Sequence, residues 1–209
     1  MLNSLRRIRF AFPRQKRVIR VLKAICCVAS AVLAEQTVAA QPVSSLDWRA
    51  AAENVVRLEP VQFSFLSKPT IALLEQLGCK IPQHAFSKEP NNLITGQFLK
   101  RGQIDVALLC ERGQTTTLLL LPSMGKGKPM PMAVSSVEGY LQVLGPDEIG
   151  FSWGIGKVQL KKFMRASEEA GCKWRSDYPP HGIADAFIEK ASTVWYRSHS
   201  GWQGCQGSD

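Results

Sequence analysis

Three apolar segments separated by short turns constrain the fold of this chain more than any other feature. They span residues 92–98, 104–110 and 115–121. Gly102 and Gly113 lie in the two connections, and turn residues at intervals of roughly ten residues are typical of an antiparallel meander. Because the third segment ends in consecutive leucines, we expect its strand to be covered on both faces or to pack under a helix.

Two amphipathic helices are predicted, one before and one after these strands. In the first, Ser67 and Pro69 suit the start of a helix, and apolar residues follow at helical spacing as far as Gly78. The second covers residues 158–170 and ends at Gly171. Both helices are short, so we expect their apolar faces to cover the sheet.

The other segments predict short strands and loops. Residues 122–136 contain three prolines and two glycines, which favour a flexible basic loop. Residues 140–144 suit a further strand, and residues 183–187 a short turn or helix. Residues 192–197 and 202–205 are predicted to form a hairpin.

Together these elements predict an α+β domain over residues 66–209. We expect a single antiparallel β-meander sheet with two helices packed on one face and a C-terminal hairpin. Residues 41–65 are expected to form an irregular leader before this domain. No internal repeat or long linker divides the sequence, so one domain is predicted.

The first 40 residues have the composition of a secretory signal peptide. Eight of the 26 Lys and Arg residues lie here against one acidic residue, Glu35, and they precede an apolar run at 24–34. A basic region, an apolar region of about ten residues and small residues at the end are the parts of such a peptide. We expect cleavage after Ala40, with Ala34 as the alternative. An uncleaved anchor or a mitochondrial presequence would have a similar composition.

The charge of the chain follows from this segment. The whole chain carries a formal net charge of +9, but residues 41–209 keep only 18 basic and 16 acidic side chains, a net charge of +2. A nucleic-acid site needs a sustained basic face, and none is present, so no nucleic-acid partner is expected. The apolar run is shorter than the about 20 residues of a membrane span, so membrane contact is expected only through the uncleaved signal segment.

Four cysteines remain after residue 40, namely Cys79, Cys110, Cys172 and Cys205. An even number of cysteines in an exported chain predicts disulfides. Three pairings are possible, and the sequence does not choose among them. A zinc site is the alternative, but no two of these cysteines stand two to four residues apart as zinc ligands usually do. The expected location is exported, either periplasmic or secreted.

One motif suggests nucleophilic catalysis. Residues 150–154 match the G-x-S-x-G pattern in which glycines let a sharp strand-to-helix turn expose the hydroxyl of a serine, here Ser152. Asp177 with His181, or Asp185 with His199, could complete a triad in the order that this class requires. The alternative is a glycine-flanked loop that leads to the helix at 158–170. The motif also requires a buried apolar strand directly before the serine. Pro146 and two acidic residues stand there instead, which argues against a nucleophile.

The carboxylates and histidine of the same region could also bind a metal. Asp177, His181 and Asp185 recur every four residues, which on one helix would place them on one face. The two prolines at 179–180 prevent a continuous helix, so a solvated turn is the alternative. No cofactor is expected.

Other polar and aromatic residues stand out. Asp105 lies inside an apolar segment, where it either points to solvent or accepts hydrogen bonds from a turn. Aromatic residues gather in the last third of the chain: Trp153, Trp174, Trp195, Tyr196 and Trp202. Such residues either form core and cross-strand pairs or line a partner surface.

Four segments carry a resemblance to known proteins: residues 78–83 (GCKIPQ), 92–98 (NLITGQF), 102–110 (GQIDVALLC) and 185–192 (DAFIEKAS). Together they resemble a group of small exported bacterial proteins of unknown function. The resemblance implies export and a compact domain, and no activity. Residues 96–107 are also similar to one blade segment of FG-GAP propeller repeats, but a propeller needs several blades.

These observations predict an exported, non-enzymatic binding domain whose partner is a protein or a component of the cell envelope. The alternative is a small secreted serine hydrolase that uses Ser152.

Overall fold

The computed structural model describes residues 47–166, 172 and 175–207. They all belong to one compact unit, Pro42–Asp209. The predicted signal peptide, residues 1–40, lies outside the described residues.

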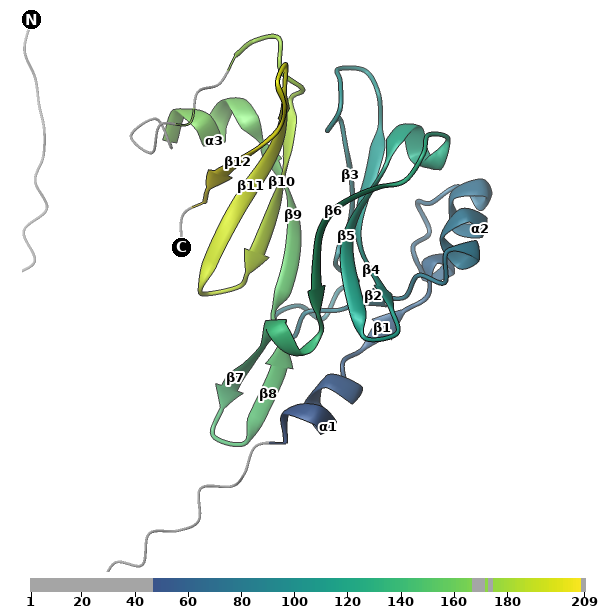
Figure 1. The fold of residues 1–209 in the computed structure, drawn as a ribbon, viewed down its shortest axis with the longest axis vertical. Helices are drawn as coiled ribbons and strands as arrows, with labels where there is room; N and C mark the ends of the chain where they lie inside the picture. Colours follow the sequence, from purple (N-terminus) through teal and green to yellow (C-terminus); the bar gives the residue numbers. More distant parts are fainter. Residues whose placement is uncertain (1–46, 167–171, 173–174, 208–209) are drawn as a thin grey trace, which may run out of the picture. The chain divides into compact units, whose positions relative to one another are not determined.

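The first four-stranded antiparallel sheet contains the predicted meander. Its strands, in spatial order, are β3 (Leu93–Gly96), β4 (Asp105–Arg112), β5 (Thr115–Leu121) and β6 (Met130–Ser136) (Figure 1). The three strands predicted between residues 92 and 121 are therefore confirmed. The flexible loop predicted at 122–136 is wrong for its second half, which pairs with β5 as β6. Pro131 is compatible with a strand here because β6 lies at the edge of the sheet.

The second four-stranded antiparallel sheet is formed by the C-terminal part of the chain. Its spatial order is β12 (Gly201–Gln206), β11 (Ala191–Ser198), β10 (His181–Phe187) and β9 (Trp153–Gln159). The predicted C-terminal hairpin is confirmed as β11 and β12. The short turn or helix predicted at 183–187 is wrong, because this segment pairs on both sides as β10. Alanine favours a helix, but intrinsic propensity is a small effect, and pairing with two neighbouring strands overrides it here.

Two further antiparallel pairs complete the β structure. β1 (Arg57–Leu58) pairs with β2 (Ile81–Pro82), and β7 (Leu141–Gly145) pairs with β8 (Glu148–Phe151). The predicted fold class, a single meander sheet with two helices on one face, is therefore wrong. The described residues are mostly β, in four antiparallel sheets of two to four strands.

Helices are short in the described residues. They are α1 (Trp48–Glu53), α2 (Lys68–Gln76) and α3 (Leu160–Ala166), with 3-10 turns η1 (Pro60–Gln62), η2 (Pro122–Gly125) and η3 (Glu138–Tyr140). α2 begins and ends as predicted, because Ser67 accepts a hydrogen bond from Thr70 N and Gly78 has a positive φ of 67°. α3 is shorter at its start than predicted because residues 158–159 belong to β9. α1 and η1 lie in the segment that was expected to be an irregular leader.

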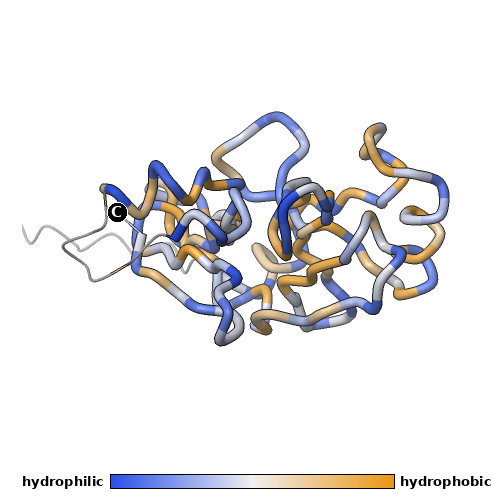
Figure 2. The backbone as a smooth tube through the Cα atoms, turned by 90° about the horizontal axis from the view of Figure 1, so that it is seen from above, coloured by the Kyte–Doolittle hydropathy of each residue, from blue (hydrophilic) through white to orange (hydrophobic). Residues whose placement is uncertain are grey.

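The leucines of β5 reach two separate clusters of buried side chains. Leu118 and Leu120 pack with Trp153 and Phe98 on one face of the sheet, whereas Leu119 and Leu121 pack with residues of α2 on the other face. Both faces of β5 are therefore covered, as its run of leucines predicts. Figure 2 shows the hydrophobic stretches of the chain lying mainly in the interior, with hydrophilic residues in the outer turns.

Two disulfides join elements that are distant in sequence. Cys79–Cys110 connects the end of α2 to β4, and Cys172–Cys205 connects the segment after α3 to β12. Each closes a loop of about 30 residues, for which the chain-entropy model gives roughly 3 to 4 kcal/mol of stabilisation. These bonds agree with folding in an oxidising, extracellular or periplasmic compartment.

Candidate functional site

Ser152, the predicted nucleophile, is buried between two strands. It separates β8 from β9, and its side chain is fully inaccessible. Its backbone pairs with Tyr140 and Ile188, and its hydroxyl donates to the Gly150 carbonyl oxygen at 3.4 Å. Residues 150–154 therefore form strand segments rather than the predicted loop or a strand-to-helix elbow. Among the described hydrogen bonds, the hydroxyl of Ser152 contacts neither His181 nor His199.

The other predicted site residues are held apart in three places. Asp177 Oδ2 lies 2.7 Å from His199 Nε2 at an exposed position. His181 Nδ1 accepts a hydrogen bond from Gln97 N at 2.9 Å. Asp185 accepts from the indole nitrogens of Trp153 and Trp195, at 2.6 and 2.9 Å. In the described part of the chain no three His, Cys, Asp or Glu side chains are placed to hold a metal ion, so Asp177, His181 and Asp185 do not share a site.

Two of the predicted aromatic residues, Trp153 and Trp195, donate hydrogen bonds to Asp185, whereas Tyr196 packs in a separate cluster with Val194 and Cys205. The ring of Tyr140 stacks on Trp153 at 4.2 Å between centroids, and Trp195 and Trp202 contact the same core. Burial raises the pKa of Tyr140, and the charge of Asp185 raises it further. The stacked pair joins η3 to β9 of the second sheet, which agrees with the core interpretation. Trp174 lies outside the described residues.

His181 joins the two larger sheets, because its ring belongs to β10 and its partner Gln97 follows β3. Nδ1 can accept the hydrogen bond of Gln97 N only while it carries no proton. Burial, followed by the charge of Lys157, lowers the pKa of His181 below its ordinary value of 6.5. Burial also lowers the pKa of His84, whose buried Nδ1 has no hydrogen-bond partner among the described residues.

These two histidines predict a loss of stability in mild acid. The unfolded chain takes up protons as pH falls through 6.5, whereas the folded chain resists protonation until a lower pH, so the free energy of unfolding falls across that interval. We expect a lower urea midpoint at pH 5.5 than at pH 7.5. His181→Asn keeps an acceptor near Gln97 without titrating, and should reduce the difference. An equal difference in His181→Asn would contradict this role for His181.

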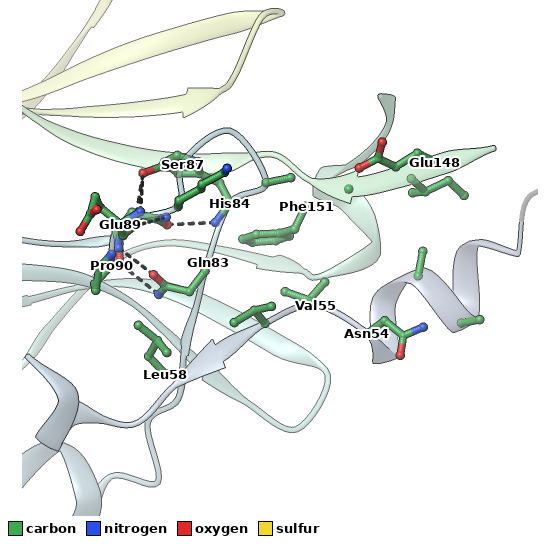
Figure 3. Close-up of a pocket in the computed structure, with 18 of the residues that line it drawn as sticks. Asn54, Val55, Leu58, Gln83, His84, Ser87, Glu89, Pro90, Glu148 and Phe151 are labelled. Atoms are coloured by element: carbon green, nitrogen blue, oxygen red, sulfur yellow. Dashed lines mark hydrogen bonds between the residues drawn. The ribbon is translucent and has the colours of Figure 1, made fainter. Parts of the chain in front are cut away.

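A cavity of about 800 Å³ is lined by His84 but by none of the predicted catalytic or metal-binding residues (Figure 3). Its lining residues belong to three segments, within residues 47–58, 83–91 and 147–151. These segments carry α1 and β1, the loop that follows β2, and the strand β8 with the turn before it. The cavity is therefore built from parts of the chain that are far apart in sequence.

Hydrogen bonds hold α1 at one side of the cavity. Asp47 caps the helix by accepting from Ala50 N at 2.9 Å. At the other end, the guanidinium of Arg57 donates to three carbonyl oxygens and, through Nε, to Glu111 Oε1 at 2.8 Å. Because Glu111 belongs to β4 and is buried, this ion pair ties the helix to the first sheet.

The loop at residues 83–91 is held closed by its own amide side chains. Gln83 accepts from Asn91 N at 2.7 Å and donates to the Asn91 carbonyl oxygen, and Asn91 Oδ1 accepts from His84 N at 2.9 Å. The backbone of the loop bonds to the two other segments that line the cavity. Gln83 N donates to Val56 O, and Ala85 N donates to Phe151 O. The cavity wall is thus preorganised.

The floor and the rim of the cavity differ in chemistry. Val55 and Phe151 are buried core residues that line it, with Leu58 beside them (Figure 3). Four carboxylates line it as well, from Asp47, Glu89, Asp147 and Glu148, against one ammonium group, from Lys88. An apolar floor with a charged rim is a common arrangement for a binding site.

The sequence predictions did not find this site. Its residues come from the expected leader, from a loop and from strands that were not predicted, and they share no motif. The spacing of Gln83 and Asn91 gives no recognisable signal, because their pairing depends on the loop conformation.

In the described residues, no helix has both the length and the apolar character needed to cross a membrane. Comparison of the chain with protein families, with curated proteins and with solved structures finds no match.

Proposed function

We propose that this chain is an exported, non-enzymatic binding domain, periplasmic or secreted, and that its ligand occupies the cavity between α1, the 83–91 loop and β8. The cavity is the observation that carries the proposal. Its volume of about 800 Å³ falls within the range of roughly 300 to 1,000 Å³ that is usual for ligand sites. Its wall is held by hydrogen bonds before any ligand arrives, which lowers the entropic cost of binding.

Other observations support binding rather than catalysis. The hydroxyl of Ser152 is buried and bonded to its own strand, whereas a nucleophile must reach its substrate. The two disulfides and the signal-like first 40 residues support an exported location.

The cavity can be tested with Nile red, a neutral dye whose fluorescence rises in apolar surroundings. We expect the full chain, purified with its disulfides formed, to enhance the dye fluorescence. Ala50 lines the cavity from α1, so Ala50→Trp should fill part of it and weaken dye binding about tenfold or more, since a blocked pocket loses most of its apolar contact.

The matched control is Ala72→Trp, which places the same side chain on an exposed position of α2. It should leave dye binding unchanged, and thermal unfolding of both variants verifies that each is folded. If Ala50→Trp folds and binds the dye as the unchanged chain does, the proposed site is wrong.

A further inference from the structure

We infer that the ligand is a peptide segment of a partner protein in which a Lys or Arg stands beside an apolar side chain. This inference rests on the proposed function and specifies the chemistry of its ligand. It follows from two properties of the same cavity, its charge and its exposed apolar residues.

The charge of the cavity is opposite in sign to the net charge of residues 41–209. Four carboxylates against one ammonium group give the lining a formal charge of −3, whereas residues 41–209 carry +2. Glu89 and Glu148 are exposed at the rim and come from different segments, the 83–91 loop and β8. Each of them can face a cationic group of a ligand, and an anionic ligand would be repelled.

Exposed apolar side chains lie in two of the segments that line the cavity. Val56 lines the cavity and is 62% exposed, and Phe86, in the loop, is 40% exposed. Large exposed apolar residues next to a concave site are typical of surfaces that contact proteins. Together with the apolar floor, they would accommodate the aliphatic part of a Lys or Arg and a neighbouring apolar side chain.

The single ammonium group does not change this preference. Lys88 lies between Ser87 and Glu89 in the loop and is exposed. It can pair with a carboxylate of the partner, but the four carboxylates of the lining still favour a cationic segment. Because the rim is exposed to solvent, screening limits each ion pair to a few-fold effect on affinity.

Displacement of Nile red by three matched peptides tests the inference. The peptides are acetyl-Leu-X-Phe-X-Leu-amide, in which X is Lys, Ser or Glu. We expect the Lys peptide to displace the dye at a concentration about tenfold lower than the Ser peptide, and the Glu peptide to be weaker still, with the preference decreasing as salt is added. The double variant Glu89→Gln with Glu148→Gln should reduce the preference for Lys to about twofold.

The matched control is the double variant Glu75→Gln with Glu138→Gln, which removes the same charge from exposed positions that do not line the cavity. It should keep the tenfold preference. If Nile red binds but the three peptides displace it equally, or the preference survives in Glu89→Gln with Glu148→Gln, the inference is wrong and the binding domain stands. Displacement by dodecyltrimethylammonium but by no peptide would also overturn the peptide class. Failure of the dye to bind would instead remove the proposed function itself.

Discussion

Asn92→Ala is expected to lower the free energy of unfolding by about 3 to 5 kcal/mol. The Asn92 side chain is buried and makes three hydrogen bonds to backbone groups. Nδ2 donates to the carbonyl oxygens of Pro82 and Trp153, each at 2.8 Å, and Oδ1 accepts from Ile155 N at 3.0 Å. Alanine would leave all three groups without a partner in a position that water cannot reach. Urea unfolding at neutral pH measures the loss.

Backbone conformation adds to the effect. Asn92 has a positive φ of 59°, a region in which asparagine and glycine are tolerated better than alanine. Asn92→Gly removes the same hydrogen bonds without this penalty, and should be more stable than Asn92→Ala by about 1 kcal/mol. Asn54→Ala, at an exposed position of the same residue type, should change stability by less than about 0.5 kcal/mol. A loss below about 1 kcal/mol in Asn92→Ala would show that the Asn92 side chain does not hold β2 and β9 together.

Local sequence signals predicted the elements whose stability is local. Ser67 and Gly78 mark the ends of α2 through hydrogen bonds and a dihedral angle that depend on adjacent residues. The hairpin turns at Gly102 and Gly113 work in the same way, since both glycines adopt a positive φ. Such features can be recognised without knowing the rest of the fold.

The division into sheets depends on distant contacts that no local pattern contains. β6 and β10 have weak strand propensity and form because each finds a partner strand. Asn92 is a single polar residue at the start of an apolar segment, yet it contacts Trp153 and Ile155 about sixty residues later. The candidate cavity was missed for the same reason, because its three segments meet only in the folded chain.

Asp105 is the residue for which the sequence offered two alternatives, and the structure selects the second. Its carboxylate is fully buried rather than exposed to solvent. Oδ2 accepts from Phe98 N and Leu99 N at 3.1 and 3.0 Å, and Oδ1 accepts from Ser123 N at 3.0 Å and from Gln103 Nε2. The carboxylate therefore joins the turn after β3 to the turn after β5.

Asp105→Asn is expected to cost about 3 to 5 kcal/mol of unfolding free energy, although the two side chains have nearly the same shape. An asparagine amide has one acceptor oxygen, so its NH₂ group would face two donors on whichever side it takes. Two donors would then lose their partner, and the charge-assisted character of all four hydrogen bonds would be lost. Chemical unfolding of Asp105→Asn and of the unchanged chain, both with disulfides formed, measures this difference.

Asp47→Asn makes the same chemical change at the exposed N-cap of α1, where one oxygen accepts one hydrogen bond from Ala50 N. Asparagine caps a helix about as well as aspartate, so this variant should be within about 0.5 kcal/mol of the unchanged chain. The contrast separates the loss of a charge from the loss of acceptor capacity in a buried site. If both variants lost equal stability, the four hydrogen bonds of Asp105 would not account for its position inside an apolar strand. A large loss in Asp105→Asn alone means that the chain needs a carboxylate there to keep the two turns together.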